Sequence, residues 1–194
     1  MSRIDTDICV IGAGSGGLSV AAGAVQMGAR VVLIEAGEMG GDCLNTGCVP
    51  SKALIAAAKA AEAQRRGFGG ITPVAPAVDF GAVKDYVESV IAAIAPHDSQ
   101  ERFEGLGCTV IRGFGRFTSP REVAVGDIRI QARRFVIATG SRPMVPPIQG
   151  VETTPFLTNE TIFALRERPA HLLVIGGVPI GGGNAPAHRR PWAA

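Results

Sequence analysis

The sequence places two cysteines, Cys43 and Cys48, close together, with Leu44-Asn45-Thr46-Gly47 between them. Pro50 suits the first position of a helix, so we expect Cys48 to lie just before a helix N-terminus, where the helix dipole stabilises a thiolate. Lys52 adds a positive charge about one turn further on. This chemistry leaves three interpretations open: a redox-active pair, a metal site, or two unrelated core cysteines.

The remaining cysteines and the histidines argue against a metal site. No second close cysteine pair occurs, and the three histidines, His97, His171 and His188, are far apart in the sequence. Cys9 and Cys108 lie in predicted strands, where a buried cysteine behaves as a small apolar core residue. We therefore predict that no metal is bound and that the close pair is redox-active.

The segment that precedes the cysteine pair has the pattern of a parallel βαβ unit. Its parts are a predicted strand at Asp7–Ile11, an alanine-rich helix at Leu18–Met27 and a second strand at Arg30–Glu35. The 18 uncharged residues Ile8–Val25 approach the length of a membrane span, but five glycines interrupt them. Because each glycine weakens a helix by about 1 kcal/mol, a strand, a turn and a helix are the preferred interpretation.

The pattern Gly12-x-Gly14-x-x-Gly17 lies between the first strand and the helix. The first glycine allows a tight turn, the second lets a pyrophosphate approach the backbone, and the third lets the helix and strand pack closely. The N–H groups at the start of the helix favour a phosphate. Glu35 ends the second strand, where an acid accepts hydrogen bonds from both hydroxyls of an adenosine ribose. The sequence therefore predicts a dinucleotide site; the alternative is a glycine-rich turn without a ligand.

The rest of the chain adds the elements of an α/β fold. We predict helices at 50–66 and 80–95, the second ended by Pro96, and a short helix after Thr158. Further strands are predicted at 108–117, 122–125, 128–132, 135–138 and 172–175. The last strand enters Gly176-Gly177 and repeats the strand-and-glycine start. We therefore expect a parallel sheet with helices, an additional antiparallel β-meander, and an incomplete second unit at the C-terminus.

Composition and charge limit the classes of function. Of the 194 residues, 46% are hydrophobic and 19% are charged, which is typical of a globular chain of about one domain. A net charge of +2 and an aromatic content of 5% provide neither a strong basic field nor a stacking platform. We therefore expect no nucleic-acid partner and no membrane partner. The start of the chain fits a signal peptide poorly, so we expect a cytoplasmic protein.

These motifs resemble the class I pyridine nucleotide–disulfide oxidoreductase family. The resemblance is carried by Gly12-Ala-Gly-Ser-Gly-Gly17, by Glu35, and most specifically by Gly40-Gly-Asp-Cys-Leu-Asn-Thr-Gly-Cys-Val-Pro-Ser-Lys52. It extends from residue 5 to residue 180, and the Ser-Lys ending of the cysteine segment is most similar to the lipoamide dehydrogenase and mercuric reductase branches. Asp42 stands where the family usually has threonine. The resemblance implies a Rossmann-like FAD-binding domain.

The family also implies a role for each motif. Cys43 would be the thiol that meets the substrate, Cys48 would lie against the flavin, and Lys52 would lie near the reactive flavin nitrogen. Residues 113–115 are similar to the stretch whose backbone meets the adenine, and residues 138–143 to a second flavin contact. The resemblance implies that FAD binds to Gly12, Gly14, Ser15, Gly16, Gly17, Glu35, Gly41, Asp42, Cys43, Cys48, Lys52, Phe114, Gly115, Ala138, Thr139, Gly140 and Ser141.

A complete member of the family would pass electrons from NAD(P)H through FAD to a Cys43–Cys48 disulfide, and on to a small-molecule disulfide, dithiol or metal-ion substrate. It would be a homodimer. Here residues 1–150 are predicted to form the FAD-binding domain, and residues 151–194 a connector and the incomplete start of an NAD(P)-binding domain. Val178 stands where the second glycine of the nicotinamide fingerprint belongs. The family pattern is lost after Gly181, so we expect a frameshifted or truncated product of a longer gene.

Two other classes of function are weighed against this one. The first is a non-catalytic FAD-binding fragment or remnant of a longer oxidoreductase. The second is a small thiol–disulfide module that works without nicotinamide. The cysteine spacing disfavours the second, because a thioredoxin-type site has two residues between its cysteines.

Overall fold

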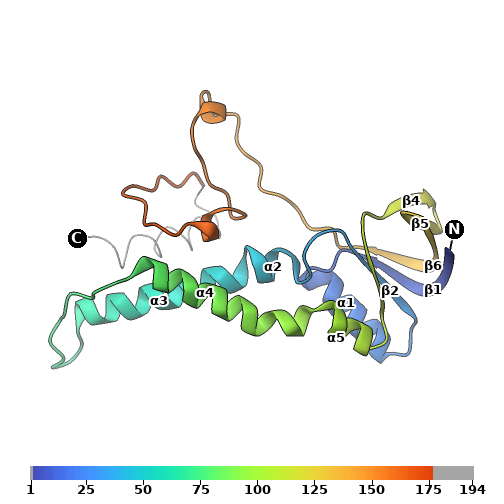
Figure 1. Ribbon diagram of the computed structural model, residues 1–194, viewed down its shortest axis with the longest axis horizontal. Coiled ribbons are helices and arrows are strands. Elements are labelled where there is room, and N and C mark those ends of the chain that lie inside the picture. Colours follow the sequence, from blue (N-terminus) through green and yellow to red (C-terminus); the bar gives the residue numbers. More distant parts are fainter. Residues whose placement is uncertain (1, 177–194) are drawn as a thin grey trace. The chain divides into compact units, whose positions relative to one another are not determined.

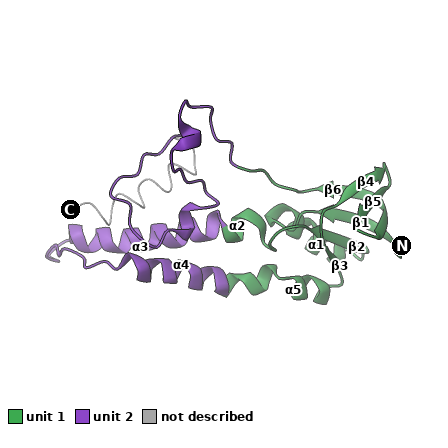
Figure 2. Ribbon diagram, turned by 45° about the horizontal axis from the view of Figure 1, so that its top comes forward, with its two compact units in different colours: residues 1–45, 93–142 green, residues 46–92, 143–194 purple. Residues whose placement is uncertain are grey.

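The computed structural model describes residues 2–176 (Figure 1). The chain divides into two compact units, which Figure 2 shows in different colours. Unit 1 consists of residues 1–45 and 93–142, and unit 2 of residues 46–92 and 143–194. The predicted glycine fingerprint around Val178 lies outside the described residues, and the predicted domain boundary at residue 150 stays a prediction.

Unit 1 is built on a six-stranded sheet in the order β3-β2-β1-β6-β5-β4. The parallel strands are β1 (Ser2–Ile11), β2 (Val31–Glu35), β3 (Thr109–Arg112) and β6 (Ile128–Ile137). β4 (Arg116–Ser119) and β5 (Glu122–Val125) form an antiparallel meander with β6. This confirms the predicted parallel sheet with an additional meander.

The centre of the sheet is covered on both faces. The four apolar residues of β2, Val31–Ile34, are each at most 2% exposed, as expected for an apolar run in a central parallel strand. Val31 and Leu33 pack with Leu18 of α1 (Ser15–Gln26) and Phe103 of α5 (Gln100–Gly105). On the other face, Val32 and Ile34 pack with Val123 and Val125 of the meander. Unit 1 therefore has three layers, with the parallel sheet in the middle (Figure 1).

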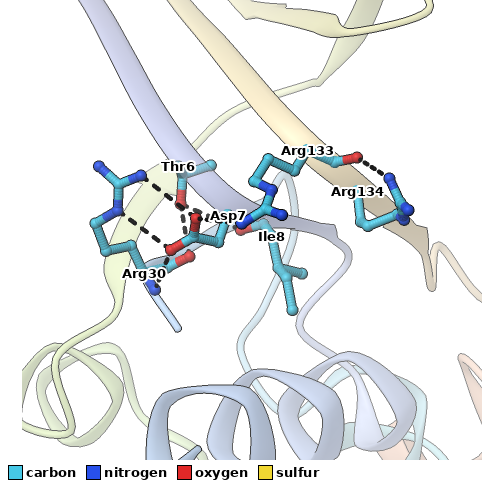
Figure 3. A network of polar contacts seen from close by, with 6 residues as sticks. All are labelled: Thr6, Asp7, Ile8, Arg30, Arg133 and Arg134. Atoms are coloured by element: carbon cyan, nitrogen blue, oxygen red, sulfur yellow. Dashed lines mark hydrogen bonds and ion pairs between the residues drawn. The ribbon is translucent and has the colours of Figure 1, made fainter. Parts of the chain in front are cut away.

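Asp7 joins β1 to the start of β2. Its Oδ2 accepts hydrogen bonds from the backbone N–H of Arg30 at 3.0 Å and from Arg30 Nε at 3.2 Å, and Arg133 Nη1 lies 3.8 Å from Oδ1 (Figure 3). Thr6 Oγ1 donates to the carbonyl oxygen of Arg30 at 2.8 Å. The hydrogen bonds from Arg30 lower the pKa of Asp7. This contact therefore stabilises the sheet above the ordinary pKa of an aspartate, and the stabilisation is lost as the pH falls through the lowered value.

Four of the predicted strands are divided, merged or absent in the structure. The predicted strand at 108–117 is divided into β3 and β4, because Gly113 has φ of +143°, which no regular strand adopts. The predicted strands at 128–132 and 135–138 form the single strand β6, which pairs with β1 over its whole length. Residues 172–175 form no strand, since no neighbouring segment pairs with them in the part of the chain that the structure describes.

The helices were predicted more closely. α3 (Cys48–Arg66) and α4 (Phe80–Ile94) lie within two residues of the expected bounds. α5 and the short α2 (Gly41–Asn45) were not predicted, and the segment after Thr158 forms only the 3₁₀ turn η3 (Ile162–Ala164). Further 3₁₀ turns are η1 (Ala95–Asp98) and η2 (Val151–Thr153). Between residues 2 and 176, no helix is long and apolar enough to cross a membrane.

Unit 2 has its own small core with an unusual charged residue. Ala53, Leu54 and Ala58 of α3 pack with Val87 of α4. Lys84 of α4 is fully buried, and its Nζ is without a hydrogen-bond partner among the described residues. The Nζ lies 5.5 Å from the ring centre of Phe163.

The surroundings of Lys84 favour its neutral form. Burial lowers the pKa of Lys84, the negative charge of Glu88 opposes this, and the positive charge of Arg166 adds to it. In the unfolded chain, Lys84 keeps the ordinary lysine pKa of 10.5. Burial of Lys84 therefore lowers the free energy of unfolding by its full amount at every pH below the pKa of the folded state. The penalty decreases as the pH rises from the folded pKa towards 10.5.

We expect Lys84→Met to raise the free energy of unfolding by about 1–3 kcal/mol near pH 7, since a buried donor without a partner costs about that much. The advantage over the wild type should shrink in alkaline solution, where the lysine loses its proton. Urea unfolding at the two pH values measures both effects. Lys59→Met, which changes an exposed lysine of α3, is the matched control. Equal stability of Lys84→Met and the wild type near neutral pH would contradict this account.

Candidate functional site

Gly12 begins the turn that leads from β1 into α1. Its φ is +104°, and a Cβ at this position would lie 2.2 Å from the carbonyl oxygen of Ala138, so no other residue fits. The N–H of Gly12 donates to the carbonyl of Ile34 at 2.8 Å, and the N–H of Ala138 donates to that of Ile11 at 2.8 Å. The structure thus brings together Gly12 and Ala138, two of the predicted FAD-binding residues. The exposed residues 139–141 continue directly from Ala138.

Gly17 lets α1 approach this turn closely. A Cβ on Gly17 would lie 1.8 Å from the carbonyl oxygen of Gly12 and 3.3 Å from Val10 Cγ1, so a side chain has no space. Gly16, the preceding residue, has no atom within 4 Å of its Cβ position. Two adjacent glycines of α1 therefore have different surroundings, and only Gly17 is required by the packing.

A second loop crosses over the glycine-rich turn. The N–H of Gly40 donates to the carbonyl of Ala13 at 2.9 Å, and Gly14 and Gly40 form an isolated β-bridge. A Cβ on Gly41, whose φ is +57°, would lie 2.7 Å from the Cα of Gly14. Backbone atoms rather than side chains thus surround the start of α1.

The N-terminus of α1 carries no side-chain cap. Gly14 is the N-cap residue and provides no side-chain cap hydrogen bond, and the first turn contains no acidic residue. The N–H of Leu18 makes the first intrahelical bond, to the carbonyl of Gly14 at 2.9 Å. The amides of residues 15–17 precede that bond, so their positive ends suit a phosphate group.

Glu35 lies half-buried at the end of β2, next to this turn. Its Oε2 accepts a hydrogen bond from the N–H of Ala13 at 2.5 Å, and its Oε1 accepts one from the N–H of Gly37 at 2.6 Å. A carboxylate has about four lone-pair positions, so about two are left for a ligand. That number matches the two ribose hydroxyls that Glu35 is predicted to bind. Ala13 and Gly37 act only through their backbone, so their residue types give no signal of this role in the sequence.

Residues 113–115 connect β3 to β4 beside Glu35. The N–H of Gly113 donates to the carbonyl of Glu35 at 2.8 Å. A Cβ on Gly113 would lie 2.7 Å from Val125 Cγ1. Because glycine has no side chain, the linker can pack closely against the meander. Phe114, in the middle of the linker, is 85% exposed. The structure therefore places the predicted adenine-contacting stretch next to the predicted ribose-binding acid.

An open hollow of about 600 Å³ adjoins this linker, a volume in the range of small-molecule pockets. Arg116, Ala124 and Arg129 are partners in the register of β4, β5 and β6, so the two arginines flank a small residue, and Arg129 Nε lies 3.9 Å from Glu122 Oε1. The sequence analysis did not single out these arginines, because only the strand register brings them together. The lining consists of Phe114, Gly115, Arg116, Thr118, Ala124, Gly126 and Arg129.

Cys43 lies on α2 in unit 1 and is half-buried. The Asn45 side chain holds this short helix, since its Nδ2 donates to the carbonyls of Met39 at 3.1 Å and Gly41 at 2.8 Å. Asp42 lies in the first turn, where a negative charge is favourable. The segment Gly41–Asn45 is therefore one short helix held by a side-chain amide.

Cys48 is the first residue of α3 in unit 2, and both Cys48 and Lys52 are exposed. The helix begins two residues earlier than expected, so that Pro50 occupies its third position instead of its first. A proline is still tolerated there, because the N–H groups of the first turn have no intrahelical acceptor. Cys43 and Cys48 belong to different units, and their pairing stays a prediction.

Cys9 and Cys108 are core residues, as predicted. They are 0% and 5% exposed. Burial raises the pKa of Cys9 to about 12, and it also raises the pKa of Cys108. Both thiols are therefore protonated and unreactive at neutral pH. Within residues 2–176, no cluster of three or more His, Cys, Asp and Glu side chains is placed to hold a metal ion.

Comparison with known proteins identifies the family. The family model described as pyridine nucleotide-disulphide oxidoreductase matches residues 6–187. The chain belongs to this family. A solved structure, the Cu(II) complex of the HOCl-induced flavoprotein disulfide reductase RclA from Escherichia coli, is similar, with a TM-score of 0.79 and 27% identity. The similarity covers 95% of this chain and 40% of that one, and it confirms the Rossmann-like fold.

Two curated members of the pyridine nucleotide-disulphide oxidoreductase family show the same partial coverage. The chain is 37% identical to mercuric reductase from Streptomyces lividans over 183 residues. It is 36% identical to dihydrolipoyl dehydrogenase from Thermus scotoductus over 178 residues. Each alignment covers 90% of this chain and 38% of the relative, so the chain spans less than half the length of these relatives.

The two adjacent glycines of α1 give a matched pair of variants. Gly17→Ala places a methyl group against the Gly12 carbonyl, and we expect it to lower the free energy of unfolding by about 3 kcal/mol or more. Gly16→Ala meets open space within a helix and should leave stability unchanged or raise it by up to about 1 kcal/mol. Thermal unfolding of the cofactor-free proteins measures both. Equal stability of the two variants would show that α1 does not approach the turn closely.

Proposed function

We propose that this chain is the FAD-binding portion of a flavoprotein disulfide oxidoreductase of the mercuric reductase or dihydrolipoyl dehydrogenase type. The observation that supports it most is the glycine-rich turn of residues 12–17, which backbone atoms surround and which ends at the uncapped start of α1. Glu35, with about two acceptor positions left, lies beside it. These features suit the pyrophosphate and the ribose of a dinucleotide.

In this proposal, four groups of residues bind different parts of FAD. In this proposal, the amides of residues 15–17 bind the pyrophosphate, and Glu35 binds the ribose of the adenosine. Phe114 and Gly115 meet the adenine, while residues 138–141 and the cysteine segment, from Gly41 and Asp42 to Lys52, contact the rest of the cofactor. Residues 1–150 form the FAD-binding domain in this proposal.

Cys43 and Cys48 carry the chemistry in this proposal. FAD, when bound, supplies the transfer of an electron pair from NAD(P)H to a disulfide. The Cys43–Cys48 disulfide takes up two electrons and two protons and becomes two thiols. The Cys43 thiolate attacks a substrate disulfide and releases one thiolate; Cys48 then attacks the Cys43 sulfur, releases the second thiolate and re-forms the disulfide. The same soft thiolates suit a metal-ion substrate.

Some properties belong to the complete protein in this proposal. They are the NAD(P)H site, the homodimer and a cytoplasmic location. A second candidate function is FAD binding without turnover. It is favoured by the length of the relatives, of which the chain covers 38%.

The first experiment is an absorption spectrum of the purified chain, with mass spectrometry of any released cofactor. We expect about one FAD per chain, because one glycine-rich turn with one ribose-binding acid forms one dinucleotide site. A colourless protein that takes up no added FAD would refute both the proposal and its alternative.

Anaerobic titration with dithionite tests the cysteine pair. The wild type with bound FAD should take up two electrons for the flavin and two for the disulfide. Cys43→Ser and Cys48→Ser should each take up only the two flavin electrons. Cys108→Ser, which changes a buried and unreactive thiol, is the control and should behave as the wild type. Equal uptake by all four proteins would favour FAD binding without disulfide chemistry.

A further inference from the structure

One peptide turn beside the candidate ribose site is held from two sides. The N–H of Gly37 donates to Oε1 of Glu35 at 2.6 Å. The carbonyl oxygen of Gly37 accepts a hydrogen bond from Nη2 of Arg112. Arg112 is the last residue of β3 and lies opposite Glu35 in the parallel register of β2 and β3. An exposed arginine of one strand thus fixes the turn that follows the neighbouring strand.

Arg112 acts on the backbone and leaves the carboxylate accessible. In the described part of the chain, no ion pair joins Arg112 to Glu35, although their strands are adjacent. A guanidinium paired with the carboxylate would occupy the lone pairs that a ribose needs. Because Arg112 binds the Gly37 carbonyl instead, Glu35 keeps about two acceptor positions.

The turn of residues 36–40 also reaches the glycine-rich turn. The N–H of Gly40, at its end, donates to the carbonyl of Ala13 at 2.9 Å. The N–H of the same Ala13 donates to Glu35 Oε2 at 2.5 Å. The turn therefore connects the ribose-binding acid with the backbone expected to bind the pyrophosphate. A hydrogen bond that holds the Gly37 peptide therefore restrains both the Glu35 carboxylate and the backbone of the glycine-rich turn.

We propose that Arg112 is a positioning residue for the adenosine half of a bound dinucleotide. It holds the Gly37 carbonyl, and through the turn of residues 36–40 it keeps Glu35 directed at the ribose hydroxyls. It makes no contact with the flavin half. This inference rests on the proposed function, since it requires that the chain bind FAD.

The test compares ligands that contain adenosine with one that does not. FAD and FMN are titrated into the cofactor-free chain and followed by flavin fluorescence, and ADP is measured by competition with FAD. Arg112→Ala should raise the Kd for FAD and for ADP by about tenfold, as expected for the loss of one hydrogen bond from a charged donor. The Kd for FMN should not change. Arg112→Lys keeps a charged donor and should recover part of the FAD affinity.

The controls separate positioning from general destabilisation. Arg121→Ala removes an arginine that has no contact with the turn and should leave all three affinities unchanged. Arg112→Met also lacks the donor but keeps an aliphatic side chain, and we expect it to weaken FAD and ADP binding as Arg112→Ala does. It replaces Arg112→Ala in the test if the alanine variant folds poorly. A variant that weakens FAD and FMN equally would overturn the inference, because it would indicate a loss of structure.

The inference and the proposed function can fail separately. If the wild type binds FAD and both donor-free variants bind FAD and ADP as tightly as it does, the inference alone is wrong. If the wild type binds neither FAD nor ADP, the proposed function is wrong, and the inference is wrong with it.

Discussion

The candidate site depends on the close approach of α1 to the turn after β1. The carbonyl oxygen of Gly12 occupies the space of a side chain at residue 17, with 1.8 Å between that oxygen and the Cβ position. This contact fixes the start of the helix beside the ends of β1, β2 and β6. Residue 12 is constrained in the same way by Ala138. With a larger residue at either position, the helix would shift away from the strand ends. The amides at its start and the Glu35 carboxylate would then no longer lie beside the same ligand site.

Most contacts that organise this point are made by the backbone. The amides of Ala13 and Gly37 hold Glu35, and the amide of Gly40 holds the loop against the turn. The donors of these contacts cost no side-chain entropy, because glycine and alanine have no rotamers to lose, but the Glu35 side chain must be ordered to accept two of them. Asn45 adds a side chain that binds two carbonyl groups of the cysteine segment. Backbone groups therefore hold both the Glu35 carboxylate and the loop that contains Gly40 beside the start of α1.

Patterns within short segments predicted much of this arrangement. The glycine spacing, the acid at the end of β2, the two long helices and the cores around Cys9 and Cys108 all follow from local rules.

The features that local patterns do not predict depend on contacts between distant segments. Arg112 and Arg116 gain their neighbours only through the strand register, and β6 is continuous only because β1 pairs with it. Residues 172–175 show the converse, because this apolar run has no paired neighbour within residues 2–176 and forms no strand. Lys84 could not be predicted as buried, since a lysine within an amphipathic helix is normally solvated.

The uncapped start of α1 links cofactor binding to local folding. Side chains cap many helices permanently, but here Gly14 provides no cap and no acid follows it. An anionic ligand at this end would therefore act as the missing cap, and its binding free energy would be added to the stability of the first helical turn. Without it, this turn would open more often than the core strands and expose its peptide bonds to proteases. The lifetime of such a chain in the presence of proteases would then follow the supply of its cofactor as well as its own stability.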